Sequence, residues 1–244
     1  MANLSQIALG ILVIALSLLM AGYLVRRERK VTEQLQEKAA QHGWSLQRHP
    51  AARRAFRIKG RSGEIHWEME LFRSGKQQSA LTLWRCMDGG YDGGPALIGV
   101  GLDRLYGQAA PGEEPRPDVN ELGWQLLLRP SGWGVFAAFS PLGLQQLGIE
   151  PSGLSPQTAG SSAFQARYTV LAHSLTGAER LLSPTLERAL LDWPESKSFI
   201  DYPLLVAGRE EITIRLHNDR PAEQPELLEK IIGLGLALVE NTRP

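Results

Sequence analysis

The stretch EIHWEMELF, residues 64–72, alternates polar and apolar side chains without interruption. Ile65, Trp67, Met69 and Leu71 share one face, and the residues between them are acidic or His. Successive side chains of a strand point to opposite faces, so this period of two predicts a strand with one face in the core. The chain is therefore expected to contain a β-sheet with an apolar side and a polar side.

Further segments extend the sheet toward the C-terminus. SALTLWRCM (79–87) alternates in the same way, and RSGKQQ (73–78) suits a hairpin between the two strands. WQLLLRPSGWGVFAAF (124–139) predicts two more short strands around a Pro-Ser-Gly turn. FQARYTVLA (164–172) predicts a strand, and YPLLVAGREEITIRLHN (202–218) predicts another hairpin. Strands joined by hairpins pair antiparallel, so we predict a mainly antiparallel sheet.

Helices are expected near and at the C-terminus. GAERLLSPTLERALLDW (177–193) predicts a helix that restarts at Ser183 and Pro184, because Ser caps helices and Pro suits the first helical position. PELLEKIIGLGLALVEN (225–241) predicts a closing helix with a wide apolar face, whose two internal glycines allow close approach to the sheet. The predicted fold class of this part is α+β.

Residues 164–244 also resemble a group of uncharacterised bacterial proteins with one N-terminal membrane anchor and an α+β domain. The shared feature is a helix start of the form A-x-x-L-L-[ST]-P-x-L, matched here by Ala178, Leu181, Leu182, Ser183, Pro184 and Leu186. At the preceding turn the chain has His173 and Ser174 where the group has Asp. The resemblance implies the layout of the chain and no chemistry, because no activity is established for the group.

The N-terminal part predicts a membrane anchor. Residues 7–25 contain no charge, and their 19 residues would span roughly 28 Å as a helix, close to the ~30 Å core of a bilayer. Residues 1–6 lack the Lys or Arg of a signal peptide, and the run lacks a small-residue cleavage pattern. We therefore expect residues 1–25 to form a tail and a retained single transmembrane helix. The anchor residues are Ile7, Leu12, Leu16, Leu19 and Val25.

Basic residues set the predicted orientation. Arg26, Arg27, Arg29 and Lys30 follow the apolar run, and the N-terminal side has no side-chain cation. Cations near a span favour the cytoplasmic side and also face anionic lipid headgroups. We expect a single-pass protein of the inner membrane with its N-terminus outside and its C-terminal domain in the cytoplasm. A periplasmic domain is the alternative.

The composition of the rest of the chain predicts where its segments begin and end. RRERKVTEQLQEKAAQHG (26–43) predicts a stalk helix with a narrow apolar stripe that suits another copy or a partner's helix. A Gly-, Ser- and Pro-rich stretch at 148–163 then separates a β-rich half (44–160) from a β-α-β-β-α half (161–244). The two halves are two domains or parts of one domain.

Charge and cysteine content exclude some classes. Lys plus Arg equals Asp plus Glu, 26 of each, so the balance gives no case for nucleic acid. Cys86 is the only cysteine, so no internal disulfide forms, and we expect it to be buried rather than reactive. The five histidines have no spacing typical of a zinc site. No metal site, cofactor site or catalytic residue is predicted.

Two groups of residues are nevertheless candidates for chemistry. His66, Glu68 and Glu70 share the polar face of one strand, where a carboxylate can tune an imidazole, although a solvated face is the simpler interpretation. DGGYDGGP (88–95) offers Asp88 and Asp92 but lacks the ligand spacing of a calcium loop and the Lys of a phosphate loop. We interpret it as a turn and keep the two aspartates as a candidate functional loop.

The resulting functional hypothesis is a membrane-anchored, non-catalytic interaction module, an adaptor or accessory subunit of a membrane assembly. Its expected partners are the lipid bilayer and either a membrane protein or a second copy of the chain. The alternative is a membrane-anchored enzyme whose site assembles around Asp88, Asp92, His66 or Cys86.

Overall fold

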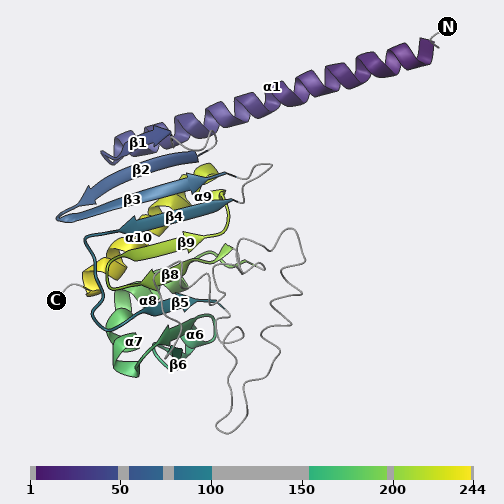
Figure 1. The fold of residues 1–244 in the computed structure, drawn as a ribbon. Helices are drawn as coiled ribbons and strands as arrows, with labels where there is room; N and C mark the ends of the chain where they lie inside the picture. The colour runs from purple at the N-terminus through teal and green to yellow at the C-terminus, as the bar shows by residue number, and fades with distance from the viewer. Residues whose placement is uncertain (1–3, 49–54, 74–79, 101–153, 197–200, 243–244) are drawn as a thin grey trace. The chain divides into compact units, whose positions relative to one another are not determined.

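The computed structural model describes residues 4–48, 55–73, 80–100, 154–196 and 201–242, without the side chains of residues 4–10 and 24. The chain divides into two compact units, Met1–Gly43 and Trp44–Pro244. Figure 1 shows the elements of each unit along the chain.

The first unit is helix α1, Leu4–Gln41. It ends before Gly43, whose φ of 68° stops helical geometry as the sequence predicts. Val31, Leu35 and Ala39, the predicted apolar stripe, are buried.

The predicted transmembrane anchor is wrong. Among the described residues, no helix is long and apolar enough to cross a membrane. Helix α1 continues without a break from its apolar part into the charged residues that follow. The assignment of Ile7, Leu12, Leu16, Leu19 and Val25 to a span, and with it the single-pass fold class, is corrected accordingly. The predicted cellular location and the role of Arg26, Arg27, Arg29 and Lys30 stay predictions.

The second unit is built on one nine-stranded sheet of order β1-β2-β3-β4-β9-β8-β5-β7-β6. Every neighbouring pair in it is antiparallel. The strands are β1 Ser45–Arg48, β2 Ala55–Ser62, β3 Ile65–Phe72, β4 Leu81–Cys86, β5 Ala96–Gly99, β6 Ser155–Gln157, β7 Thr169–Ala172, β8 Leu204–Ala207 and β9 Ile212–Leu216. The predicted antiparallel α+β architecture is therefore confirmed for this unit.

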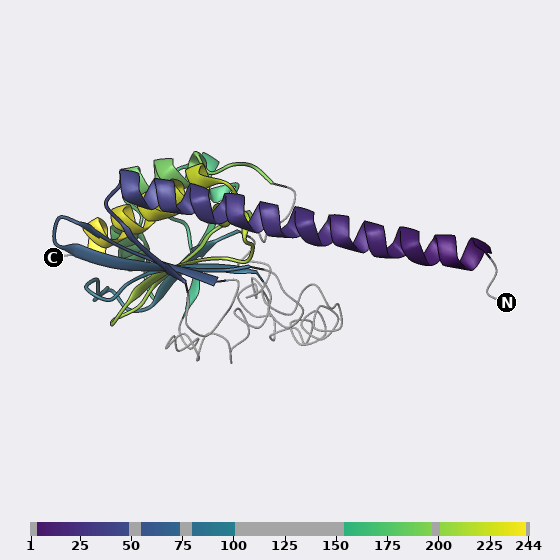
Figure 2. The same ribbon diagram turned by 90° about the horizontal axis from the view of Figure 1, so that it is seen from above.

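Helices cover one face of this sheet, as the turned view in Figure 2 shows. They are α6 Ser162–Gln165, α7 Leu175–Leu181, α8 Pro184–Leu191, α9 Arg220–Glu223 and α10 Pro225–Thr242. The predicted restart between α7 and α8 is confirmed, since the Ser183 hydroxyl accepts a hydrogen bond from the Leu186 amide at 3.2 Å. The predicted closing helix is α10.

Strand register separates the two faces of the sheet. Met69 lies opposite Trp84, Trp84 opposite Ile214, and Ile214 opposite Leu205, so these side chains form one row across four strands. All four are buried. Gly235 of α10 approaches the Trp84 ring, so this row faces the helices. Residues that alternate with the row occupy the opposite face. It is here called the open face because the helices of this unit lie on the other side, although Thr213 and Leu204 on it are buried.

Two segments differ from the predictions. Residues 164–172 are not one strand: the Ser161 hydroxyl caps the short helix α6, and β7 starts only at Thr169. Strands β1, β2, β5 and β6 were not predicted. The strands predicted in residues 124–139 lie outside the described residues.

Candidate functional site

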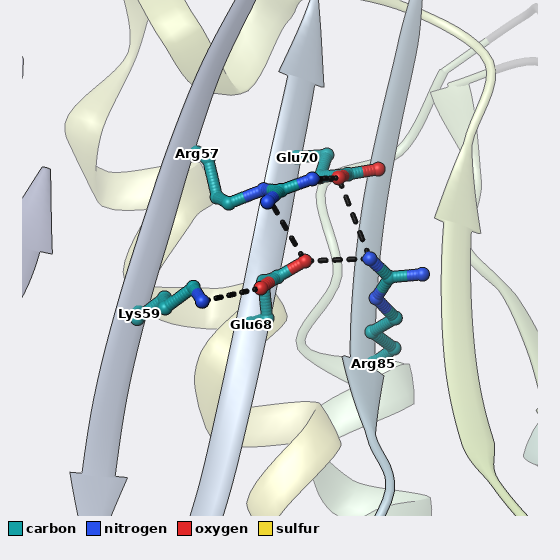
Figure 3. Close-up of polar contacts among 5 residues, drawn as sticks. All are labelled: Arg57, Lys59, Glu68, Glu70 and Arg85. Carbon is teal, nitrogen blue, oxygen red and sulfur yellow. Dashed lines mark hydrogen bonds and ion pairs between the residues drawn. The ribbon is translucent and has the colours of Figure 1, made fainter. Parts of the chain in front are cut away.

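Five charged side chains meet on the open face of β2, β3 and β4 (Figure 3). Here they are called the charged network: Arg57, Lys59, Glu68, Glu70 and Arg85. Glu68 lies 2.6 Å from Arg85, 3.2 Å from Lys59 and 3.4 Å from Arg57. Glu70 lies 2.7 Å from Arg57 and 3.4 Å from Arg85. Two carboxylates therefore bridge three cations from both neighbouring strands.

Register explains the network. Lys59 lies opposite Glu68 and Arg57 opposite Glu70 in the β2–β3 pair, while Arg85 lies opposite Glu68 in the β3–β4 pair. Side chains directly opposite in antiparallel strands are close enough to interact, so alternating charges of opposite sign pair across the strands. On the predicted acidic face of β3, Glu68 and Glu70 are therefore each paired with cations of β2 and β4.

Burial makes the network more than a solvated face. The Glu70 side chain is 9% exposed and that of Glu68 is 17% exposed. Burial alone would raise the pKa of Glu68, but hydrogen bonds from Arg85 and Lys59 outweigh it and hold that pKa below its ordinary value. The hydrogen bond between Arg85 and Glu68 also raises the pKa of Arg85. Glu68 is therefore suited to an ionised, structural role.

The structure pairs His66 with Asp88. One Asp88 carboxylate oxygen lies 3.0 Å from the His66 Nδ1 and accepts the His66 amide at 3.1 Å. The His66 and Asp88 side chains are 63% and 45% exposed, so this pair lies at the surface. A joint site of His66, Glu68 and Glu70 stays a prediction.

The two aspartates of the predicted functional loop have different partners. Asp92 lies 2.9 Å from Arg180 of α7. Within the described residues, no group of three or more His, Cys, Asp or Glu side chains is placed to hold a metal ion. Cys86 is fully buried in β4, opposite Ile212. The role predicted for Asp88 and Asp92 stays a prediction.

A second polar group lies on the open face of β9 and was not predicted. Thr213 and Arg215 alternate along this strand, and His217 directly follows its last residue. Each has a buried polar atom without a hydrogen-bond partner in the described structure: Oγ1, Nε and Nε2. Burial lowers the pKa of Arg215, and burial together with the Arg215 charge lowers the pKa of His217 to about 4. His217 is therefore neutral near pH 7.

Helix α1 presents an apolar surface. The described large side chains in residues 11–25 are between 56% and 72% exposed. They are Ile11, Leu12, Val13, Ile14, Leu16, Leu18, Leu19, Met20, Tyr23 and Val25. Contiguous exposed apolar surface is typical of sites that bind a protein, a membrane or a ligand, whereas single exposed apolar residues are common on any surface.

Sequence reasoning missed the cations of the charged network and all of the β9 group. The signal for the network was the alternation of Arg57, Lys59 and Arg61 in AFRIKGRS, which complements the acidic alternation of β3. For β9 the signal was weaker, since T-I-R-L-H reads as an ordinary half-exposed strand.

Comparison with protein-family models, with curated proteins and with solved structures finds no match for this chain. The resemblance of residues 164–244 to the membrane-anchored group stays a prediction.

Proposed function

We propose that this protein is a non-catalytic interaction module that associates with further copies of itself through helix α1. The observation that carries the proposal is the exposed apolar surface of residues 11–25. Removing apolar surface from water is favourable by about 25 cal/mol per Å², so ten such side chains in one helix form a strong drive to associate.

The distribution of apolar and charged residues favours a bundle of antiparallel α1 helices. The exposed apolar side chains occur in consecutive positions rather than in one stripe, so more than one neighbouring helix is needed to cover them. Arg26, Arg27, Arg29 and Lys30 directly follow the apolar part. Parallel helices would place these four cations beside each other, and antiparallel helices separate them by the length of the apolar part.

The test is the mass of the purified full chain by size exclusion with light scattering. We expect a multiple of the 26.9 kDa chain mass. The variant Leu12→Gln/Leu16→Gln/Leu19→Gln should elute as a single chain, because it replaces three exposed apolar side chains with polar ones. Glu33→Gln/Glu37→Gln is the matched control in the charged half of α1 and should associate like the wild type.

Three results would overturn the proposal. The first is a wild-type mass of one chain, and the second is unchanged association of the triple variant. The third is flotation of the wild type with phosphatidylcholine vesicles that requires the same three leucines while no association occurs without vesicles. That third result would mean that the apolar surface of α1 binds lipid rather than another copy of the chain.

A further inference from the structure

Arg215 is a partly buried cation on the open face of β9. Its Nε atom is buried without a hydrogen-bond partner in the described structure, and no described ion pair includes its guanidinium. Burying a charge is unfavourable unless it is paired and hydrogen-bonded. The described residues therefore supply no partner for the buried Nε atom of Arg215.

The neighbours of Arg215 on both adjacent strands are apolar. Leu83 of β4 and Leu204 of β8 lie directly opposite it in the two ladders. Leu204 is buried, so this side of the guanidinium has a low local dielectric. An anion that reaches Arg215 there would interact with it more strongly than at a wet surface.

One acidic group near Arg215 is held by other cations, and a second acts on Arg215 without a described ion pair to it. Glu70 lies in the same cross-strand row beyond Leu83, but it is held by Arg57 and Arg85. Glu211 acts on Arg215 through its field, and it also acts on Arg85. Of the three cations in the charged network, Arg85 is the one on β4, the strand that pairs with β9.

Two further groups complete a set of donors. Thr213 precedes Arg215 on the same face, and its hydroxyl is buried without a hydrogen-bond partner in the described structure. Arg85 lies directly opposite Thr213, which places it diagonally across from Arg215. Diagonal neighbours in an antiparallel pair are within reach of long side chains, so two guanidinium groups flank one hydroxyl.

We propose that the open face of β9 binds an anionic group, a carboxylate or a phosphate, through the Arg215 guanidinium, with Thr213 and Arg85 as further donors. The planar guanidinium matches two anionic oxygens at once, which suits both kinds of group. The Thr213 hydroxyl supplies a third hydrogen bond. The proposal is independent of α1 and goes beyond association of the chain.

The test is thermal unfolding of the full chain in sodium phosphate, in sodium acetate and in sodium chloride of equal ionic strength. A ligand that binds only the folded state raises the melting temperature in a saturable way. We expect such a rise over chloride in at least one of the two anions, and which anion causes it identifies the acid group. The rise should be lost in Arg215→Met, reduced in Thr213→Val and retained in Lys59→Gln, a cation of the same face.

Baseline stability separates binding from a structural role. In chloride, Arg215→Met should melt at or above the wild-type temperature, because it replaces a partly buried charge that has no described ion pair with an apolar side chain. A marked drop would mean that the fold already satisfies Arg215, and it would overturn the proposal. No saturable rise in either anion, or an equal rise in Arg215→Met, would also overturn it.

A measurement on the wild type does not depend on any variant folding. Arg215 is the charged group that acts on His217, whose pKa is about 4. An anion on Arg215 would offset that charge, so the His217 pKa should rise on binding. An NMR titration in the effective anion and in chloride should show this rise, and an unchanged His217 midpoint would count against the site.

Discussion

Gly235 of α10 lies directly against the indole of Trp84 in β4. A Cβ atom added at Gly235 would lie 2.5 Å from Cε2 and Cζ2 of that ring, which is closer than real Cβ contacts occur. Gly233, two residues earlier, is exposed and would have no atom within 4 Å of an added Cβ. The close packing of α10 on the sheet therefore depends on Gly235, and Gly233 has no part in it.

This difference predicts opposite effects of one substitution. Gly235→Ala should destabilise the protein by about 1 to 3 kcal/mol, because the core must shift to admit a methyl group. Gly233→Ala should stabilise it by up to about 1 kcal/mol, because alanine loses less backbone entropy in a helix. Denaturant unfolding of both variants measures the difference. A Gly235→Ala variant as stable as the wild type would show that α10 can move away from Trp84.

Glu70 is predicted to contribute more to stability than Lys59, although both belong to the charged network. Glu70→Gln removes a nearly buried carboxylate between Arg57 and Arg85, and we expect a loss of about 2 kcal/mol. The Lys59 side chain is 52% exposed, so Lys59→Gln should cost less than about 1 kcal/mol. Unfolding free energies at low salt compare the two. Equal costs would mean that burial does not strengthen this network.

The network also shows where sequence analysis succeeds and where it stops. The alternation of residues 64–72 was sufficient to predict β3 and its two faces, because that pattern is local. It could not predict that Arg57 and Arg85 hold Glu70, since which strands flank β3 is decided by pairing over long separations. A glutamate on the polar face was therefore interpreted as solvated, and it is buried.

The same limit applies to the order of the strands. The hairpin of β8 and β9 and the Ser183-Pro184 break between α7 and α8 were predictable from turn and capping residues. The pairing of β4 with β9 was not, because more than a hundred residues separate residues 81–86 from residues 212–216. That pairing places Arg85 beside Thr213, so the candidate anion site could not be predicted from local patterns.

A glycine in β2 shows the same limit at a single position. Gly60 alone suggests an interrupted strand, yet β2 continues through it and the Trp67 ring of β3 covers it.

His217 predicts a loss of stability as the pH falls. Its pKa is about 4 in the folded protein, against an ordinary value of 6.5, because burial and the Arg215 charge disfavour the imidazolium. Between these two pKa values the unfolded chain binds a proton that the folded chain does not, so stability rises with pH in this window. From about pH 7 to about pH 5 the expected loss is about 2 kcal/mol.

Unfolding free energies of wild type and His217→Gln at the two pH values measure this contribution. The variant lacks the imidazole, so its stability should change less over the window. The pKa of the Glu68 carboxylate is held below 4.5, so its effect on the pH dependence of stability falls at lower pH. It therefore does not obscure the effect of His217 between pH 5 and pH 7. An equal loss in wild type and variant would show that His217 is not the group responsible.

Ser183 connects the start of α8 to the end of α10. Its hydroxyl oxygen accepts the Leu186 amide at 3.2 Å and the Asn241 side-chain amide at 2.5 Å. Ser183→Ala should cost about 1 kcal/mol for the lost helix cap and more for the lost partner of Asn241. Because the two residues share a hydrogen bond, the double variant with Asn241→Ala should be more stable than the sum of the single costs predicts, by about 0.5 kcal/mol or more.

Ser174 provides the control for this coupling. Its hydroxyl caps α7 by accepting the Gly177 amide at 3.1 Å, so Ser174→Ala should also cost about 1 kcal/mol. No described hydrogen bond joins Ser174 to Asn241, so their effects should add within about 0.5 kcal/mol. Denaturant unfolding of the five variants completes both cycles. Additive costs for Ser183 and Asn241 would mean that their contact does not hold α10 to α8 in solution.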